Sequence, residues 1–112
     1  MNDREVAEGL CVVLLTAPDA ASAQRLARAL VEEGLAACVN RIPGLHSIYR
    51  WQGAVQEAAE ELLIAKTLRA RIPALAERVA DLHPYALPEV IALPVVGGSA
   101  AYLDWVRSES TA

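Results

Sequence analysis

A histidine, a tyrosine and a glutamate lie close together in the segment His83-Pro84-Tyr85-x-x-Pro88-Glu89. The two prolines restrict the backbone of this segment, and a rigid loop is a favourable place for a binding site. The neutral imidazole of His83 suits a borderline metal ion such as copper or zinc. In the alternative interpretation His83 only closes the preceding helix, because a cation is favourable at a helix C-terminus.

A second group of side chains able to do chemistry comes from a predicted hairpin and comprises Trp51, Glu60 and Lys66. Because alternate residues of a strand share a face, Glu60 and Lys66 lie on the same face as the apolar Leu62 and Ile64. A charge on an apolar face needs a partner. One interpretation is an ion pair that sets the register at a contact between subunits. The other is a polar pocket lined by an acid, a base and an indole.

Four soft or borderline metal ligands, Cys11, Cys38, His46 and His83, are scattered along the chain. Cys38 and His46, the nearest two, are eight positions apart, whereas zinc sites place ligands at tight local spacings. We therefore expect no closed structural metal site, and a weak, open site assembled between subunits remains the alternative. The sequence has no GxSxG, Walker, GxGxxG or HExxH motif and no visible nucleophile–base pair, so we do not expect an enzyme.

The composition indicates one domain that associates with other copies of itself. Of the 112 residues, 54% are hydrophobic, and a domain of this length buries only about two-thirds of its unfolded surface. The apolar excess needs either a membrane or another subunit. The longest apolar run, residues 10–17, is far shorter than the ~20 residues of a membrane helix. We predict a single domain over residues 1–112, with a loose segment at 1–9, that forms an oligomer and has no membrane partner.

Charge, the N-terminal residues and cysteine content indicate which partners and which cellular compartment to expect. The net charge is −4 and there is no basic run, so nucleic acid is not an expected partner. The first five residues mix both charges and lack the basic start and apolar core of a signal peptide, so we expect a cytoplasmic protein. A reducing compartment disfavours a disulfide, and Cys11 and Cys38 are expected to be small buried strand residues.

Hydrophobic periodicity predicts the order of the elements. They are a strand over residues 10–17, a helix over 20–33, extended hairpin arms over 35–50 and ending at 67, a helix from about 71 to 82, a strand over 90–96 and a short helix over 100–108. This order is typical of an α+β ferredoxin-like domain, a split βαβ sandwich whose two long helices cover one face of an antiparallel sheet. The other face is left open for another subunit.

Individual residues mark where these elements begin and end. Asp19 caps the first helix and Gly34 ends it. Pro43-Gly44 predicts a bulge in an edge strand, and Gln52-Gly53 a hairpin turn. Each hairpin arm of about sixteen residues would reach about 50 Å if straight, so its outer part should pack on another subunit. Gly97-Gly98-Ser99 is interpreted as a turn, with an anion site at the next helix N-terminus as the alternative.

Six segments together resemble the CutA family of divalent-cation tolerance proteins. They are Thr16-Ala-Pro-Asp19, Gly34-Leu-Ala-Ala-Cys-Val-Asn40, Ile42-Pro-Gly44, Tyr49-Arg-Trp-Gln-Gly53, Glu60 with Lys66-Thr67, and His83-Pro-Tyr-x-x-Pro-Glu89. The resemblance spans about residues 12–106, nearly the whole chain. It implies a homotrimer of ferredoxin-like subunits whose sheets pack edge to edge.

The resemblance also implies copper binding and tolerance to copper and other divalent ions. The bacterial copper-binding pattern has a cysteine where this sequence has Leu15, and a second histidine where it has Leu82. Only His83 carries over as a metal ligand. We therefore expect no obligatory cofactor, and at most weak binding of Cu²⁺ or another divalent metal.

The family pattern further implies a cleft between subunits that contains Cys38, Trp51, Glu60, Lys66 and Tyr85. Two functions of different class follow. The first is a cytoplasmic trimer that takes part in divalent metal tolerance through weak copper binding. The second is a trimeric signalling or scaffold module that binds a small ligand or a protein partner at the cleft, by analogy with other trimers of this fold class.

Overall fold

The computed structural model describes residue 7 and residues 9–111. Its strands are β1 (Leu10–Ala17), β2 (Cys38–Trp51), β3 (Ala54–Leu68) and β4 (Ile91–Pro94), and its helices are α2 (Ala20–Glu32), α3 (Ile72–Leu82) and α4 (Ala100–Glu109), with a 3₁₀ turn over Arg69–Arg71. The predicted loose segment 1–9 falls outside the described residues except for Ala7, which is buried, and Gly9, whose carbonyl accepts a hydrogen bond from the Arg69 amide.

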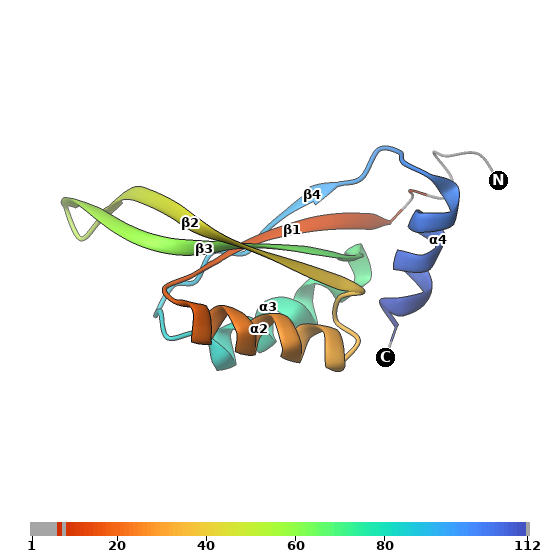
Figure 1. The fold of residues 1–112 in the computed structure, drawn as a ribbon, viewed down its shortest axis with the longest axis horizontal. Coiled ribbons are helices and arrows are strands. Elements are labelled where there is room, and N and C mark those ends of the chain that lie inside the picture. The colour runs from red at the N-terminus through yellow and green to blue at the C-terminus, as the bar shows by residue number, and fades with distance from the viewer. Residues whose placement is uncertain (1–6, 8, 112) are drawn as a thin grey trace.

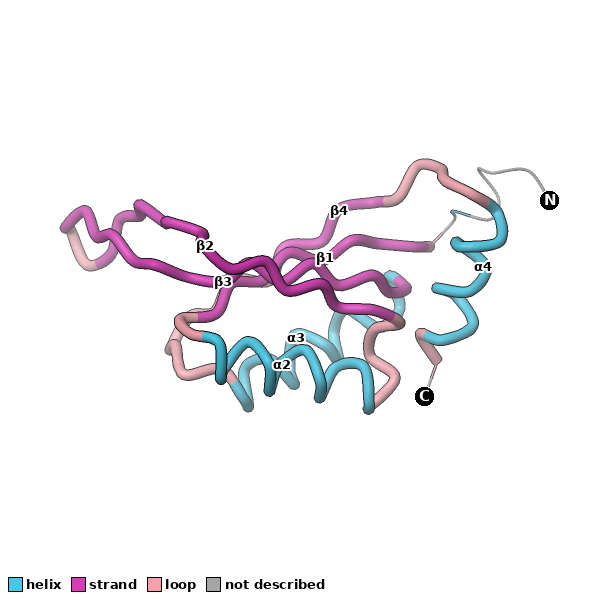
Figure 2. The backbone as a smooth tube through the Cα atoms, viewed as in Figure 1, coloured by secondary structure: helices cyan, strands magenta, loops and turns pink. Residues whose placement is uncertain are grey.

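The four strands form one antiparallel sheet in the order β2-β3-β1-β4. Helices α2 and α3 lie side by side under one face of this sheet, and α4 stands at the end of the sheet where β1 begins (Figures 1 and 2). This arrangement confirms the predicted ferredoxin-like α+β fold with a short C-terminal helix. None of the helices in the described part of the chain has the length and apolar character needed to cross a membrane.

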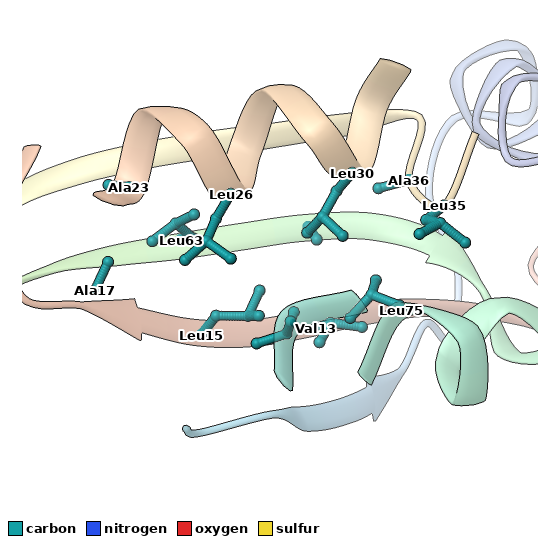
Figure 3. Packing of buried hydrophobic residues seen from close by; sticks show 12 residues of the cluster. Val13, Leu15, Ala17, Ala23, Leu26, Leu30, Leu35, Ala36, Leu63 and Leu75 are labelled. Atoms are coloured by element: carbon teal, nitrogen blue, oxygen red, sulfur yellow. The ribbon is translucent and has the colours of Figure 1, made fainter. Parts of the chain in front are cut away.

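The main core lies between the sheet and helices α2 and α3. Val13, Leu15 and Leu63 alternate along β1 and β3 and have no exposed surface, because every second side chain of a strand points to the helices. They pack with Leu26 and Leu30 from the apolar stripe of α2, and Figure 3 shows these side chains filling the space between the layers. The predicted strand over residues 10–17 is present, but its nearly continuous apolar run, which is typical of a strand covered on both faces, is covered by helices on one face only.

The opposite face of the sheet is apolar and largely uncovered. The intervening residues of β1 and β3, among them Leu14 and Ile64, are only half-buried. On the neighbouring strand β4, Ile91 and Leu93 are 49% and 47% exposed. The described residues cover this face at the end nearest α4, where Leu103 packs in a second apolar cluster. The open face predicted from the order of the elements is therefore present.

The β2–β3 hairpin extends well beyond the rest of the sheet. The last residue of β1 to pair with β3 is Ala17, opposite Glu61, so no third strand from the described part of the chain pairs with the outer half of the hairpin. The molecule accordingly measures 49 × 24 × 23 Å. A bulge interrupts the β2–β3 pairing between Ile42 and Leu45, where Pro43-Gly44 predicted it, and β2 is an edge strand.

Two strand boundaries differ from the prediction. Strand β2 begins at Cys38 and not at residue 35, because the amides of Leu35 and Ala36 bond back to the Leu30 carbonyl and close helix α2. Strand β4 spans only residues 91–94 of the predicted 90–96, because β1 has no further residue to pair once the Val95 amide has bonded to the Leu10 carbonyl.

Candidate functional site

His83 lies directly after helix α3 and is held by both of its ring nitrogens. Its backbone amide donates to the Val79 carbonyl at 2.8 Å and closes the helix. Its Nε2 lies 2.7 Å from the Thr16 carbonyl, and its Nδ1 lies 3.1 Å from the Tyr85 amide. A carbonyl only accepts and an amide N–H only donates, so Nε2 carries the proton and Nδ1 accepts. The imidazole is therefore neutral in this conformation and has no free lone pair for a metal.

Tyr85 continues this chain of contacts from His83 to the hairpin. Its ring packs against the His83 ring with centroids 4.7 Å apart and planes tilted by 49°. Its hydroxyl donates to Oε2 of Glu60 at 3.0 Å. Burial, the hydrogen bond to Glu60 and the negative charge of Glu60 raise the pKa of Tyr85 to about 12. The phenol is thus a permanent hydrogen-bond donor near neutral pH.

Glu60, which accepts the Tyr85 hydrogen bond, lies close enough to Glu89 for their charges to interact. Glu60 is 8% exposed, and none of the ion pairs within the described residues involves it. Burial, followed by the charge of Glu60, raises the pKa of Glu89. Two carboxylates near one another and out of water favour a shared proton or a nearby cation. The Glu60–Glu89 pair therefore suits a positively charged group.

Cys38 and Lys66 meet at the other end of the hairpin. They are directly opposite in the β2–β3 pairing, and Lys66 Nζ donates to Oδ1 of Asn40 at 2.5 Å. The Cys38 thiol is 3.9 Å from the same oxygen. Glu60 lies six positions along β3 from Lys66, about 20 Å in an extended strand. The two charges share a face as predicted, but they form no ion pair within one subunit.

Trp51 lies apart from both groups, at the outer end of the hairpin beside the turn, and is 41% exposed. The structure therefore distributes the predicted cleft residues over three places in one subunit. Glu60 and Tyr85 are joined to His83, Cys38 is joined to Lys66 through Asn40, and Trp51 is alone.

The scattered metal ligands do not gather in one subunit. Across residue 7 and residues 9–111, no three His, Cys, Asp or Glu side chains are placed to hold a metal ion. Cys11 is buried, and its pKa is raised by burial against the opposing charge of Arg69. His46 lies on the exposed hairpin with Glu57 at 3.3 Å.

Sequence reasoning did not single out Thr16 and Asn40, which hold His83 and Lys66 respectively. Thr16 contacts His83 through its backbone carbonyl, and such a contact cannot be predicted from the residue type. Asn40 carries a usable signal, because it is a polar residue that shares the apolar face of β2 with Cys38.

The sequence profile of the CutA1 divalent ion tolerance protein family matches residues 11–109. The chain belongs to this family. It is 56% identical over 99 residues to the divalent-cation tolerance protein CutA of Thermus thermophilus, covering 88% of this chain and 96% of that one. It is 48% identical over 88% of its length to the chloroplastic protein CutA of Arabidopsis thaliana, of which it spans 54%.

The fold agrees with solved CutA structures. The Cut A1 divalent cation tolerance protein from Thermus thermophilus superimposes with a TM-score of 0.89 at 54% identity, covering 91% of this chain and 99% of that one. The resemblance predicted from six short segments is therefore confirmed, and the family's ferredoxin-like subunit is confirmed with it.

Proposed function

We propose that this CutA1-family chain acts in tolerance to divalent metal ions as a cytoplasmic homotrimer. The observation that carries the proposal is the family match over residues 11–109, together with relatives that are named for divalent-cation tolerance. The clefts between subunits contain Cys38, Trp51, Glu60, Lys66 and Tyr85.

Two surfaces of the subunit support the trimer. The apolar sheet face with Ile91 and Leu93 half-exposed has nothing to cover it within the described residues. The outer hairpin exposes Ile48 and Val55 at 67% and 63%. Exposed apolar side chains of this kind are typical of subunit contacts.

Copper binding through His83 is proposed to be weak. A metal at either ring nitrogen must displace a hydrogen bond, to Thr16 or to Tyr85. Leu15 is fully buried and Leu82 packs on the same core, so apolar packing occupies the two positions where the bacterial copper-binding pattern has ligands. A lone imidazole that must first break its contacts binds a metal less tightly than a preformed ligand set.

Titration of metal-free protein with Cu²⁺ tests this assignment. We expect weak binding by the wild type, and a loss of about tenfold or more in affinity for His83→Ala, because the ligand itself is removed. His46→Ala is the matched control, since it removes an exposed histidine from the same chain and should leave the affinity unchanged. Equal affinities for wild type and His83→Ala, with the oligomer intact by native mass spectrometry, would exclude His83 as the ligand.

A second candidate function is a trimeric signalling or scaffold module that binds a small ligand or a partner. The Glu60 carboxylate and the separate ammonium of Lys66 favour it, because both are charged groups without an ion-pair partner in the described residues. An enzymatic activity is not proposed.

A further inference from the structure

A cavity of about 300 Å³ opens between the start of β1, strand β3, the segment before α4 and helix α4. Most of its wall is apolar, with Leu10, Val12, Val95 and Val106 among the lining residues. Small-molecule sites have volumes of ~300–1,000 Å³ and mostly apolar walls with a few polar groups. The cavity is therefore large enough for a small ligand and not for a nucleotide or a peptide.

Lys66 is the only charged side chain among the described residues that line this cavity. It is half-buried, and its ammonium donates to the Asn40 amide oxygen. An ammonium has three N–H donors, so Asn40 satisfies one of them. None of the ion pairs in the described chain includes Lys66. The Lys66–Asn40 hydrogen bond lies at the protein surface, and an anionic ligand group would accept a charge-assisted hydrogen bond from a remaining N–H donor of the ammonium.

The other polar groups of the wall do not compete for this role. Burial raises the pKa of the Cys11 thiol, so Cys11 stays neutral near pH 7 and supplies no negative charge to Lys66. The Ser99 hydroxyl accepts a hydrogen bond from the Tyr102 amide and caps helix α4. Tyr102 lines the cavity while 43% exposed, so the cavity borders solvent on that side.

We propose that this cavity binds a small monocarboxylate with a short hydrocarbon body. The carboxylate accepts a hydrogen bond from the Lys66 ammonium, and the hydrocarbon packs between Val12 of β1 and Val106 of α4. The inference supplies a ligand class for the second candidate function. It stands independently of metal tolerance, because none of the residues that carry it is a predicted metal ligand.

Calorimetric titration of the wild-type protein with three probes tests the two halves of the proposed ligand. Octanoate carries both the charge and the hydrocarbon, acetate carries only the charge, and octanol carries only the hydrocarbon. We expect octanoate to bind about tenfold or more tightly than octanol, the difference made by one charge-assisted hydrogen bond, and acetate to show no measurable binding.

The substitution Lys66→Met removes the ammonium while keeping an unbranched side chain of similar length. We expect it to lower octanoate affinity about tenfold or more and to remove the preference for octanoate over octanol. Arg25→Met makes the same charge change on the exposed face of α2, away from the cavity, and should bind octanoate like the wild type.

Native mass spectrometry of the same samples separates this inference from the trimer proposal. The inference is overturned if octanoate does not bind wild-type protein whose oligomeric state is unchanged. A neighbouring subunit that fills the cavity would give this result. The inference is also overturned if Lys66→Met binds octanoate as tightly as Arg25→Met. A wild-type protein that is not a trimer but still binds octanoate would count against the trimer proposal and leave the ligand site standing.

Discussion

His83 organises the loop after α3 through contacts on three sides. Its amide closes the helix, its ring bonds to β1 through the Thr16 carbonyl, and its Nδ1 holds the amide of Tyr85. Tyr85 is thereby aimed at Glu60 on β3. A histidine that was predicted either to bind metal or to end a helix does end the helix, and its neutral ring also positions the tyrosine that bonds to Glu60.

The Tyr85–Glu60 hydrogen bond should be measurable as stability. Tyr85→Phe removes the hydroxyl and leaves a buried carboxylate without that donor, so we expect a loss of about 1 kcal/mol in the free energy of unfolding. Urea denaturation at pH 7 is the measurement. Tyr102→Phe is the matched control, because Tyr102 is similarly exposed and its ring contacts Trp105 instead of a carboxylate. Equal stabilities of the two variants would contradict this role for the hydrogen bond.

The pH dependence of the same variant follows from the raised pKa of Tyr85. The folded protein holds the phenol proton more tightly than the unfolded chain, whose pKa is about 10. The stabilisation is therefore fully present below pH 10 and is lost as the pH rises toward about 12, the pKa in the folded protein. Tyr85→Phe should lack this alkaline loss, which denaturation at several pH values between 9 and 12 can resolve.

At the scale of the element, the bulge in β2 separates the inner hairpin from the outer hairpin. Pro43 and Gly44 add one residue to β2 between Ile42 and Leu45, so the side-chain alternation of β2 shifts by one across the bulge. Gly44 adopts φ +86°, a conformation that glycine reaches without strain. The bulge thus decides which residues of the outer hairpin share a face with the open side of the sheet.

Gly44→Ala should destabilise the protein through backbone strain alone. A Cβ at Gly44 meets no atom within 4 Å, so steric overlap does not contribute. We expect a loss of about 1 kcal/mol, the cost of a left-handed backbone for alanine. Gly97→Ala provides the control, because its Cβ also meets nothing and its backbone is not left-handed. The midpoint of thermal unfolding is measured for both variants. An unchanged midpoint for Gly44→Ala would show that backbone strain does not explain why glycine occupies the bulge.

At the scale of the whole molecule, the chain is an incomplete sandwich. Two helices cover one face of a four-stranded sheet, and the other face remains apolar and open except near α4 (Figure 1). The hairpin projects beyond the core and exposes apolar side chains on its outer half. A small domain with this much exposed apolar surface gains most by covering it with further copies of itself.

Native mass spectrometry of metal-free protein should give three times the 12.0 kDa mass of one chain. Leu93→Lys places a charge on the open sheet face, and we expect its trimer to dissociate at about tenfold or higher protein concentration than the wild-type trimer. Val31→Lys is the control, since Val31 is 42% exposed on α2, against 47% for Leu93. A monomeric wild type, or a Leu93→Lys trimer as stable as that of Val31→Lys, would show that the sheet face is not the interface.

The sequence alone determined the fold class, the order of the elements and the family. These follow from short-range patterns: the apolar run over residues 10–17, the apolar stripe of α2, the cap at Asp19 and the bulge residues Pro43-Gly44. Each pattern depends on neighbours along the chain, so no knowledge of distant contacts was needed. The ends of β2 and β4 were placed less well, because pairing with β1 and the closing turn of α2 set them.

Only the tertiary structure decided which of the candidate residues meet. It joined His83 and Tyr85 to Glu60 across loop and hairpin, and it paired Lys66 with Asn40 instead of Glu60. It also gave both ring nitrogens of His83 a hydrogen-bond partner. One partner is the backbone carbonyl of Thr16, which cannot be predicted from the residue type. The physical reason is that such contacts join residues far apart in the chain, and their distances depend on how strands and loops are stacked and not on spacing in the sequence.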